Sequence, residues 1–280
     1  MASRGKSRAW VERLAAHPAF RALARAGFVA RAFLYGVVGL VALASALGLR
    51  NRSPIDAKGA IAVLSRHAPT RGLAAILGVA LAGLALWFAV DAVVDPARRR
   101  GPAGAVLRAG QGAGSLGYVA LSLFALQIAL GGGLGPSGDQ LVRWWTARLL
   151  AASPGRPAVA TAGAIVVVVG ARQAWYGVRR AFAANLHLRA MPAGLRPWAL
   201  RLGTLGFATQ GLLFAATGAL LLRAAVRESP WGTGGFARVL RDVAASPAGR
   251  VGLAAAAAGL VAYAGFAAVE GTWRKLRARG

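Results

Sequence analysis

Cysteine is absent from the 280-residue sequence, histidine occurs three times, and only eight acidic residues stand against 34 basic ones. Without cysteine there are no disulfides, thiolate metal sites or cysteine nucleophiles. The histidines are isolated, and neither an H-E-x-x-H nor a G-x-S-x-G motif is present. We therefore expect no catalytic residues, no metal site and no cofactor, and a protein that is not an enzyme.

Charge is also scarce for a soluble protein, because charged residues make up 15% of the chain where about a quarter is usual. Hydrophobic residues make up 57%. A spanning helix needs about 20 apolar residues. Six runs approach or exceed this length, and the fourth is interrupted by Arg172: 32–49, 72–90, 109–138, 157–178, 202–222 and 251–269. The composition predicts a polytopic membrane protein with six transmembrane helices.

The first run could also belong to a signal peptide, since Ala44, Ser45 and Ala46 fit a small-x-small cleavage site. The basic region before it is 25 residues long, however, and the run exceeds the usual apolar core of such peptides, so we expect a retained anchor. The stretch 10–23 mixes apolar residues and arginines and contains Pro18, which we interpret as an interfacial helix broken at that proline. A frayed tail is the alternative.

The net charge of +26 comes almost wholly from arginine. The arginines flank the apolar runs instead of gathering in one soluble domain, which favours anionic lipid headgroups as partners and argues against nucleic acid. With the N-terminus in the cytoplasm, the cytoplasmic segments hold 19 basic residues and the opposite segments 13. The positive-inside rule then predicts that both termini are cytoplasmic.

The chain repeats itself. Arg25-Ala26-Gly27 recurs as Arg108-Ala109-Gly110, and a tyrosine follows ten residues after each arginine, at Tyr35 and Tyr118. A looser third copy places Phe214 at the tyrosine position, and a proline precedes each second helix at Pro69, Pro154 and Pro247. We expect a basic interfacial segment, 1–20, and three two-helix repeats: 21–98, 105–182 and 198–276. Within each repeat a short amphipathic stretch joins the two helices; it lies either along the membrane surface or as an ordinary connecting helix packed on the bundle.

The order R-x-G-F-x-x-R-x-x-x-Y-G-x-x-G is carried by 25–39, and a later helix ends Gly83-Leu84-Ala85-Leu86-Trp87. With the repeats, this pattern resembles a bacterial membrane family of unknown function, domain-of-unknown-function family 1206. The second repeat departs most, with Gly114 at the position of Arg31. The resemblance implies three tandem two-helix units in a bacterial inner membrane and no defined activity. We predict an all-α membrane protein in which three parallel repeats surround a pseudo-threefold axis.

Charged groups inside the membrane are costly, so they pair or line a pathway. The candidate polar cluster, for which snorkelling to the headgroups is the alternative, comprises Arg31, Asp91, Arg172, Gln210 and Glu270. Since a hairpin brings its helices together, we predict an Arg31–Asp91 pair; the competing account pairs Asp91 with Arg98 or Arg99. The glycines of Gly112-Ala113-Gly114-Ser115-Leu116-Gly117 open a spanning helix, so we interpret them as helix-packing residues and not as a dinucleotide motif.

Two functions remain open from the sequence. The first is a non-enzymatic membrane scaffold that associates with lipids, a membrane protein partner or a second copy. The second is a channel or transporter along the pseudo-threefold axis. A closed apolar centre favours the scaffold, and a wet centre lined by Arg31, Arg172 and glutamines favours transport.

Overall fold

A computed structural model describes residues 17–49, 54–64, 70–94, 102–247 and 249–275, and these are almost entirely helical. Among these residues six helices are long and apolar enough to cross a membrane, as many as the predicted spans, which indicates a multi-pass membrane protein. They are α2 (Pro18–Ala46), α4 (Thr70–Val94), α5 (Pro102–Ala129), α7 (Gly155–Val178), α8 (Leu195–Arg227) and α10 (Gly249–Trp273).

The first spanning helix begins earlier than the apolar run indicated. Pro18 occupies the first turn of α2, where its missing N–H costs nothing, so the proline begins this helix instead of breaking one. His17 caps the helix by accepting a hydrogen bond from the backbone N–H of Ala19 at 3.3 Å. Of the expected interfacial stretch 10–23, residues 18–23 thus belong to α2, and 10–16 lie outside the described residues.

Three shorter helices join the long ones at the expected places: α3 (Ala57–Leu64), α6 (Gly138–Leu150) and α9 (Phe236–Ala244). Ile61 of α3 and Leu240 of α9 are buried in the main apolar core, so these two are connecting helices packed on the bundle. In α6, by contrast, Trp144 and Trp145 are exposed. Only α6 among the three keeps large aromatic residues outward, as a helix lying at a membrane surface would.

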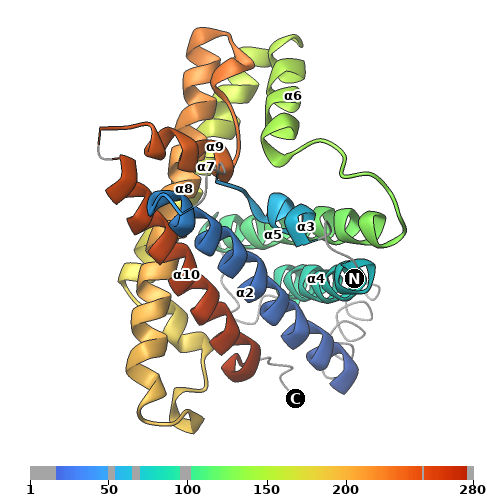
Figure 1. Cartoon of the computed structure of the whole chain (residues 1–280), viewed down its shortest axis with the longest axis vertical. Coiled ribbons are helices and arrows are strands. Elements are labelled where there is room, and N and C mark those ends of the chain that lie inside the picture. Colours follow the sequence, from blue (N-terminus) through green and yellow to red (C-terminus); the bar gives the residue numbers. More distant parts are fainter. Residues whose placement is uncertain (1–16, 50–53, 65–69, 95–101, 248, 276–280) are drawn as a thin grey trace.

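The long helices pack in three pairs, α2 with α10, α4 with α5, and α7 with α8. Each pair joins the second helix of one predicted repeat to the first helix of another. Smaller contacts link α2 to α4 and α8 to α10, whereas α5 and α7 do not pack along each other in the described part of the chain. In Figure 1 the pairs lie at different inclinations, and α4 and α5 turn away from α7 and α8.

Glycines set the close approach of α7 and α8. A Cβ atom on Gly163 would lie 2.9 Å from the backbone nitrogen of Leu222, and one on Gly218 would lie 2.6 Å from that of Val167. Gly170 and Gly211 face each other between these two contacts. Small residues let helix backbones approach in this way where lipid supplies no hydrophobic driving force.

The glycine-rich start of α5 differs from its prediction. Cβ atoms added to Gly110, Gly112 and Gly117 would meet nothing within 4 Å, and one on Gly114 would meet only the ring of Phe88, at 3.7 Å. The prediction that these glycines pack tightly against another helix is therefore wrong within a single copy of the chain. Its reason is the missing α5–α7 contact, which leaves this face of α5 uncovered.

The apolar core of the described residues falls into three clusters. Leu34, Val38, Leu81 and Leu260 belong to its main part, between α2, α4 and α10. A second group surrounds the buried Trp87, whereas Trp175 is exposed. The segment between α7 and α8 forms two short 3₁₀ helices, η1 (Ala181–Asn185) and η2 (Leu188–Ala190), held by a third cluster.

Candidate functional site

The most deeply buried charges of the described residues lie together between α2 and α10. Arg31 of α2 donates to one carboxylate oxygen of Glu270, and Arg274, one turn further along the chain, donates to the other oxygen. The Arg31 and Glu270 side chains are only 5% and 2% exposed. One carboxylate is thus shared by two guanidinium groups, and the group as a whole carries a positive charge.

Aromatic rings enclose this ion group. The Arg31 guanidinium lies 4.9 Å from the ring centre of Phe28 and 5.2 Å from that of Tyr263. The Arg274 guanidinium also lies 4.9 Å from the ring centre of Phe28. Cation–π contacts of this kind strengthen when water is removed. The Tyr118 hydroxyl from α5 lies beside the Arg31 guanidinium. The charges are therefore stabilised by an ion pair and by rings.

A chain of hydrogen bonds lies next to these rings. The buried Gln210 side chain of α8 donates to the Tyr35 hydroxyl at 2.7 Å, and Gln173 of α7 donates to the Gln210 carbonyl oxygen. The Tyr35 ring meets the Tyr263 ring edge to face, with centres 4.8 Å apart. Polar side chains from five of the six long helices thus converge, and most of their hydrogen-bonding groups are directed at one another.

The predicted Arg31–Asp91 pair is wrong, because Arg31 pairs with Glu270 instead. The reason is the helix pairing: α2 packs more closely along α10 than along α4, its partner in the hairpin. Asp91 accepts a hydrogen bond from Gln111 across the α4–α5 contact. The competing partners Arg98 and Arg99 lie outside the described residues.

Of the five candidate cluster residues, Arg31, Gln210 and Glu270 converge in the structure, and all three are buried. Arg172 lies on an exposed face of α7 and makes no hydrogen bond or ion pair with any described residue. It lies three residues before Trp175, close to the end of its helix, where snorkelling to the headgroups is the simplest account.

Sequence reasoning missed part of the site. Tyr35 and Tyr118 were recognised only as repeat markers, although their recurrence at one position was a signal that both reach the centre. Arg274 follows Glu270 by four residues, the spacing of an ion pair on one helix face. Gln173 is one of the glutamines expected beside the intramembrane charges, and Tyr263 stands in the third repeat at the position of Trp87.

A second group of polar contacts joins the segments that contain α3, α6 and α9. Asp139 accepts a hydrogen bond from the Gly235 N–H at 2.7 Å and pairs with Arg241. Asp56 accepts from the Gly59 N–H at 2.8 Å. Burial raises the pKa of Asp56, and the nearby Asp139 carboxylate raises it further, against the opposing effect of the hydrogen bond. Lys58 of α3 donates to the Pro136 carbonyl just before α6, so these contacts link the connections of the three predicted repeats.

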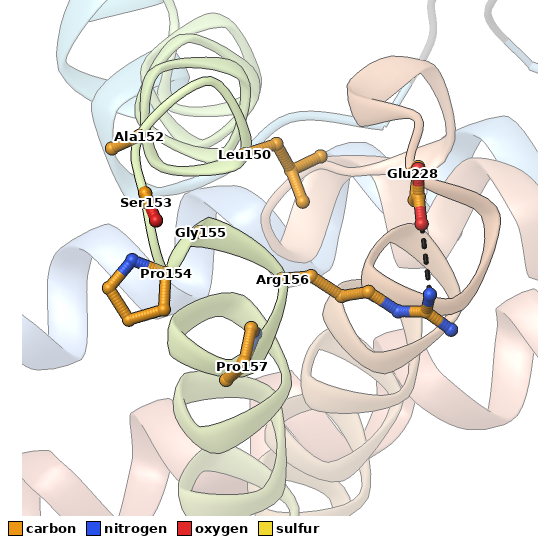
Figure 2. A pocket seen from close by; sticks show the side chains of 8 residues that line it. All are labelled: Leu150, Ala152, Ser153, Pro154, Gly155, Arg156, Pro157 and Glu228. Carbon is orange, nitrogen blue, oxygen red and sulfur yellow. Dashed lines mark hydrogen bonds and ion pairs between the residues drawn. The ribbon is translucent and has the colours of Figure 1, made fainter.

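A surface hollow of about 400 Å³ lies where α6 meets the start of α7. Arg156 and Glu228 form an ion pair of 2.9 Å across it (Figure 2). Their side chains are 60% and 66% exposed, so water reaches both charges. The hollow holds no other charged residue, and it offers no buried group that could act on a substrate.

In the described part of the chain, no three His, Asp or Glu side chains gather closely enough to hold a metal ion. The arrangement at the centre can share a proton or neutralise a charge, but it presents no nucleophile beside a base. Its chemistry is that of an ion pair within a helix bundle.

Comparisons with known proteins agree with the unknown-function resemblance. The model of the family described as Domain of Unknown Function (DUF1206) matches twice, at residues 26–95 and 205–274. The chain is also similar to the "Uncharacterized protein YxxB" of Bacillus subtilis (strain 168), with 27% identity over 264 residues, which cover 92% of this chain and 94% of that protein. No solved structure matches.

Proposed function

Because the chain belongs to the DUF1206 family, which assigns it no activity, we propose a function from its own residues: a non-enzymatic membrane scaffold that associates with lipids and with another membrane protein or a second copy. The observation that carries this proposal is the buried ion group between α2 and α10. Arg31 and Arg274 share the Glu270 carboxylate there, and the apolar core lies beside them.

A buried ion pair of this kind is costly to break, because removing one partner leaves an uncompensated charge. It therefore supports a fixed arrangement of helices better than a moving one. The exposed faces of α5 and α7, which do not pack on each other, are where a partner helix or a second copy would lie. Small residues such as Gly110 and Gly117 on α5 would admit a close approach.

The alternative function is a channel or transporter along the pseudo-threefold axis. The observation that favours it is the row of polar side chains formed by Tyr35, Gln210 and Gln173 inside the bundle. Intramembrane polar groups are common along substrate and ion paths.

The finer architecture is part of this proposal. The two family matches cover the first and third repeats, and we propose that 105–182 is a diverged middle copy. The pairing of second helices with first helices supports a pseudo-threefold arrangement of parallel repeats, which the open α5–α7 side interrupts. We place the protein in the bacterial inner membrane with both termini in the cytoplasm, on the arginine distribution.

The two functions differ in a flux assay. The purified chain is reconstituted into vesicles that contain potassium- and chloride-sensitive dyes. The scaffold proposal expects leakage equal to that of protein-free vesicles. A protein-dependent flux that changes in a Gln210→Leu variant would overturn it and support the channel. In a parallel assay, the scaffold proposal expects the purified chain to retain phosphatidylglycerol in preference to phosphatidylcholine.

A further inference from the structure

The segment between α7 and α8, residues 179–201, is here called the arginine connector. It contains five arginines and no acidic residue, and the sequence has no acidic residue at all from 140 to 227. All five arginine side chains are exposed, and none forms an ion pair with a described residue. They are Arg179, Arg180, Arg189, Arg196 and Arg201. The connector therefore presents a positive charge that the described protein does not neutralise.

The connector is held firmly against the bundle. Phe182 and Leu186 are each 1% exposed and pack with Phe266 of α10. Lys275, just after α10, donates to the Ala184 carbonyl at 3.0 Å, and Asn185 donates to the Tyr176 hydroxyl at 2.9 Å. Such contacts fix the backbone from which the arginines project, so little ordering is needed when a ligand binds.

Two tryptophans flank the connector, one at each of its helices. Arg179 lies 4.4 Å from the ring centre of Trp175 at the end of α7, and Arg201 lies 5.5 Å from that of Trp198 near the start of α8. Both tryptophans are 58% exposed. Tryptophan at the end of a spanning helix sits at the headgroup level of a bilayer, so each arginine is positioned at the depth of the lipid phosphates.

At the opposite end of α7 and α8, ion pairs neutralise some of the arginines. There Arg156 pairs with Glu228, and Arg241 pairs with Asp139. The two ends therefore differ, because carboxylates neutralise some arginines at that end and none of the five in the connector.

We propose that the arginine connector is a binding site for anionic phospholipids of the leaflet it faces. The guanidinium groups of Arg179 and Arg201 bind the headgroup phosphates, for which their planar donors are suited. Trp175 and Trp198 anchor the connector at that depth and hold the two arginines over their rings. The proposal rests on the lipid association of the proposed function and gives that association its place in the fold.

The test uses the purified full-length chain and two variants of equal charge. R179Q/R201Q removes the two arginines over the tryptophans, and R223Q/R227Q removes two exposed arginines at the other end of α8. Each is equilibrated in mixed micelles of phosphatidylglycerol and phosphatidylcholine, and native mass spectrometry counts the lipids retained. We expect R179Q/R201Q to bind phosphatidylglycerol about 30-fold more weakly than wild type, the loss that two basic residues at an anionic surface account for. The control should stay within about threefold of wild type.

Equal losses in the two variants would overturn the site and leave the lipid association standing. Equal retention of both lipids by the wild-type chain would overturn the lipid association itself. If R179Q/R201Q does not elute as a single folded species, R180Q/R189Q replaces it, and the same two comparisons apply. The conservative variant R179K/R201K keeps the charge and loses the planar fork, so its affinity should fall between those of wild type and R179Q/R201Q.

Discussion

Replacing Glu270 by glutamine is the sharpest test of the buried ion group. The substitution keeps the shape of the side chain and removes the carboxylate shared by Arg31 and Arg274. Arg31 is then a charge with a 5% exposed side chain and no anion beside it. Breaking a buried pair in this way costs about 3–5 kcal/mol. We expect that loss in the free energy of unfolding, measured by titration with sodium dodecyl sulfate and followed by tryptophan fluorescence.

The matched control is the same substitution at Glu228, whose ion pair with Arg156 is exposed on both sides. Exposed pairs contribute up to about 1 kcal/mol, so Glu228→Gln should lie close to wild type. The double variant Arg31→Met/Glu270→Leu removes both charges, and it should be more stable than Glu270→Gln alone. Equal unfolding free energies for Glu270→Gln and Glu228→Gln would refute the reasoning.

Three further predictions concern other parts of the molecule. Asp56→Asn should raise the stability of the protein at neutral pH and flatten the pH dependence of that stability in unfolding scans from pH 4 to 8. Burial raises the folded pKa of Asp56. The contribution of Asp56 to stability is therefore greatest below the unfolded pKa of about 3.9 and is lost as pH rises through the folded pKa. A wild-type chain that gains stability across that range while the variant does not would contradict this. Gly170→Leu should cost about 1–3 kcal/mol or more, because its Cβ would lie 2.5 Å from the Gly211 carbonyl, whereas Gly117→Leu meets open space and should cost little in the same detergent titration. Reporter fusions after Arg180 should report cytoplasm and fusions near Asp139 the opposite side, and a cytoplasmic signal near Asp139 would reject the orientation.

Much of the fold could be predicted from periodicity and charge. Spanning helices are long apolar runs, so their number and approximate ends follow from composition, and three of the five candidate polar residues are buried together. The partner of Arg31 could not be predicted in this way, because we expected each helix to pack mainly on its neighbour in sequence. The structure pairs α2 with α10 instead, and no local pattern encodes that choice. The same holds for the open side between α5 and α7, which leaves Gly110 and Gly117 uncovered.

The Arg31–Glu270 pair also constrains how the protein is made. The two residues are 239 positions apart in the chain. At the usual synthesis rate, roughly 12–48 s pass between the emergence of the arginine and that of its carboxylate. During this interval the guanidinium of the nascent α2 must be tolerated by the insertion machinery, by lipid phosphates or by water. A chain truncated before Glu270 would therefore leave Arg31 without its carboxylate.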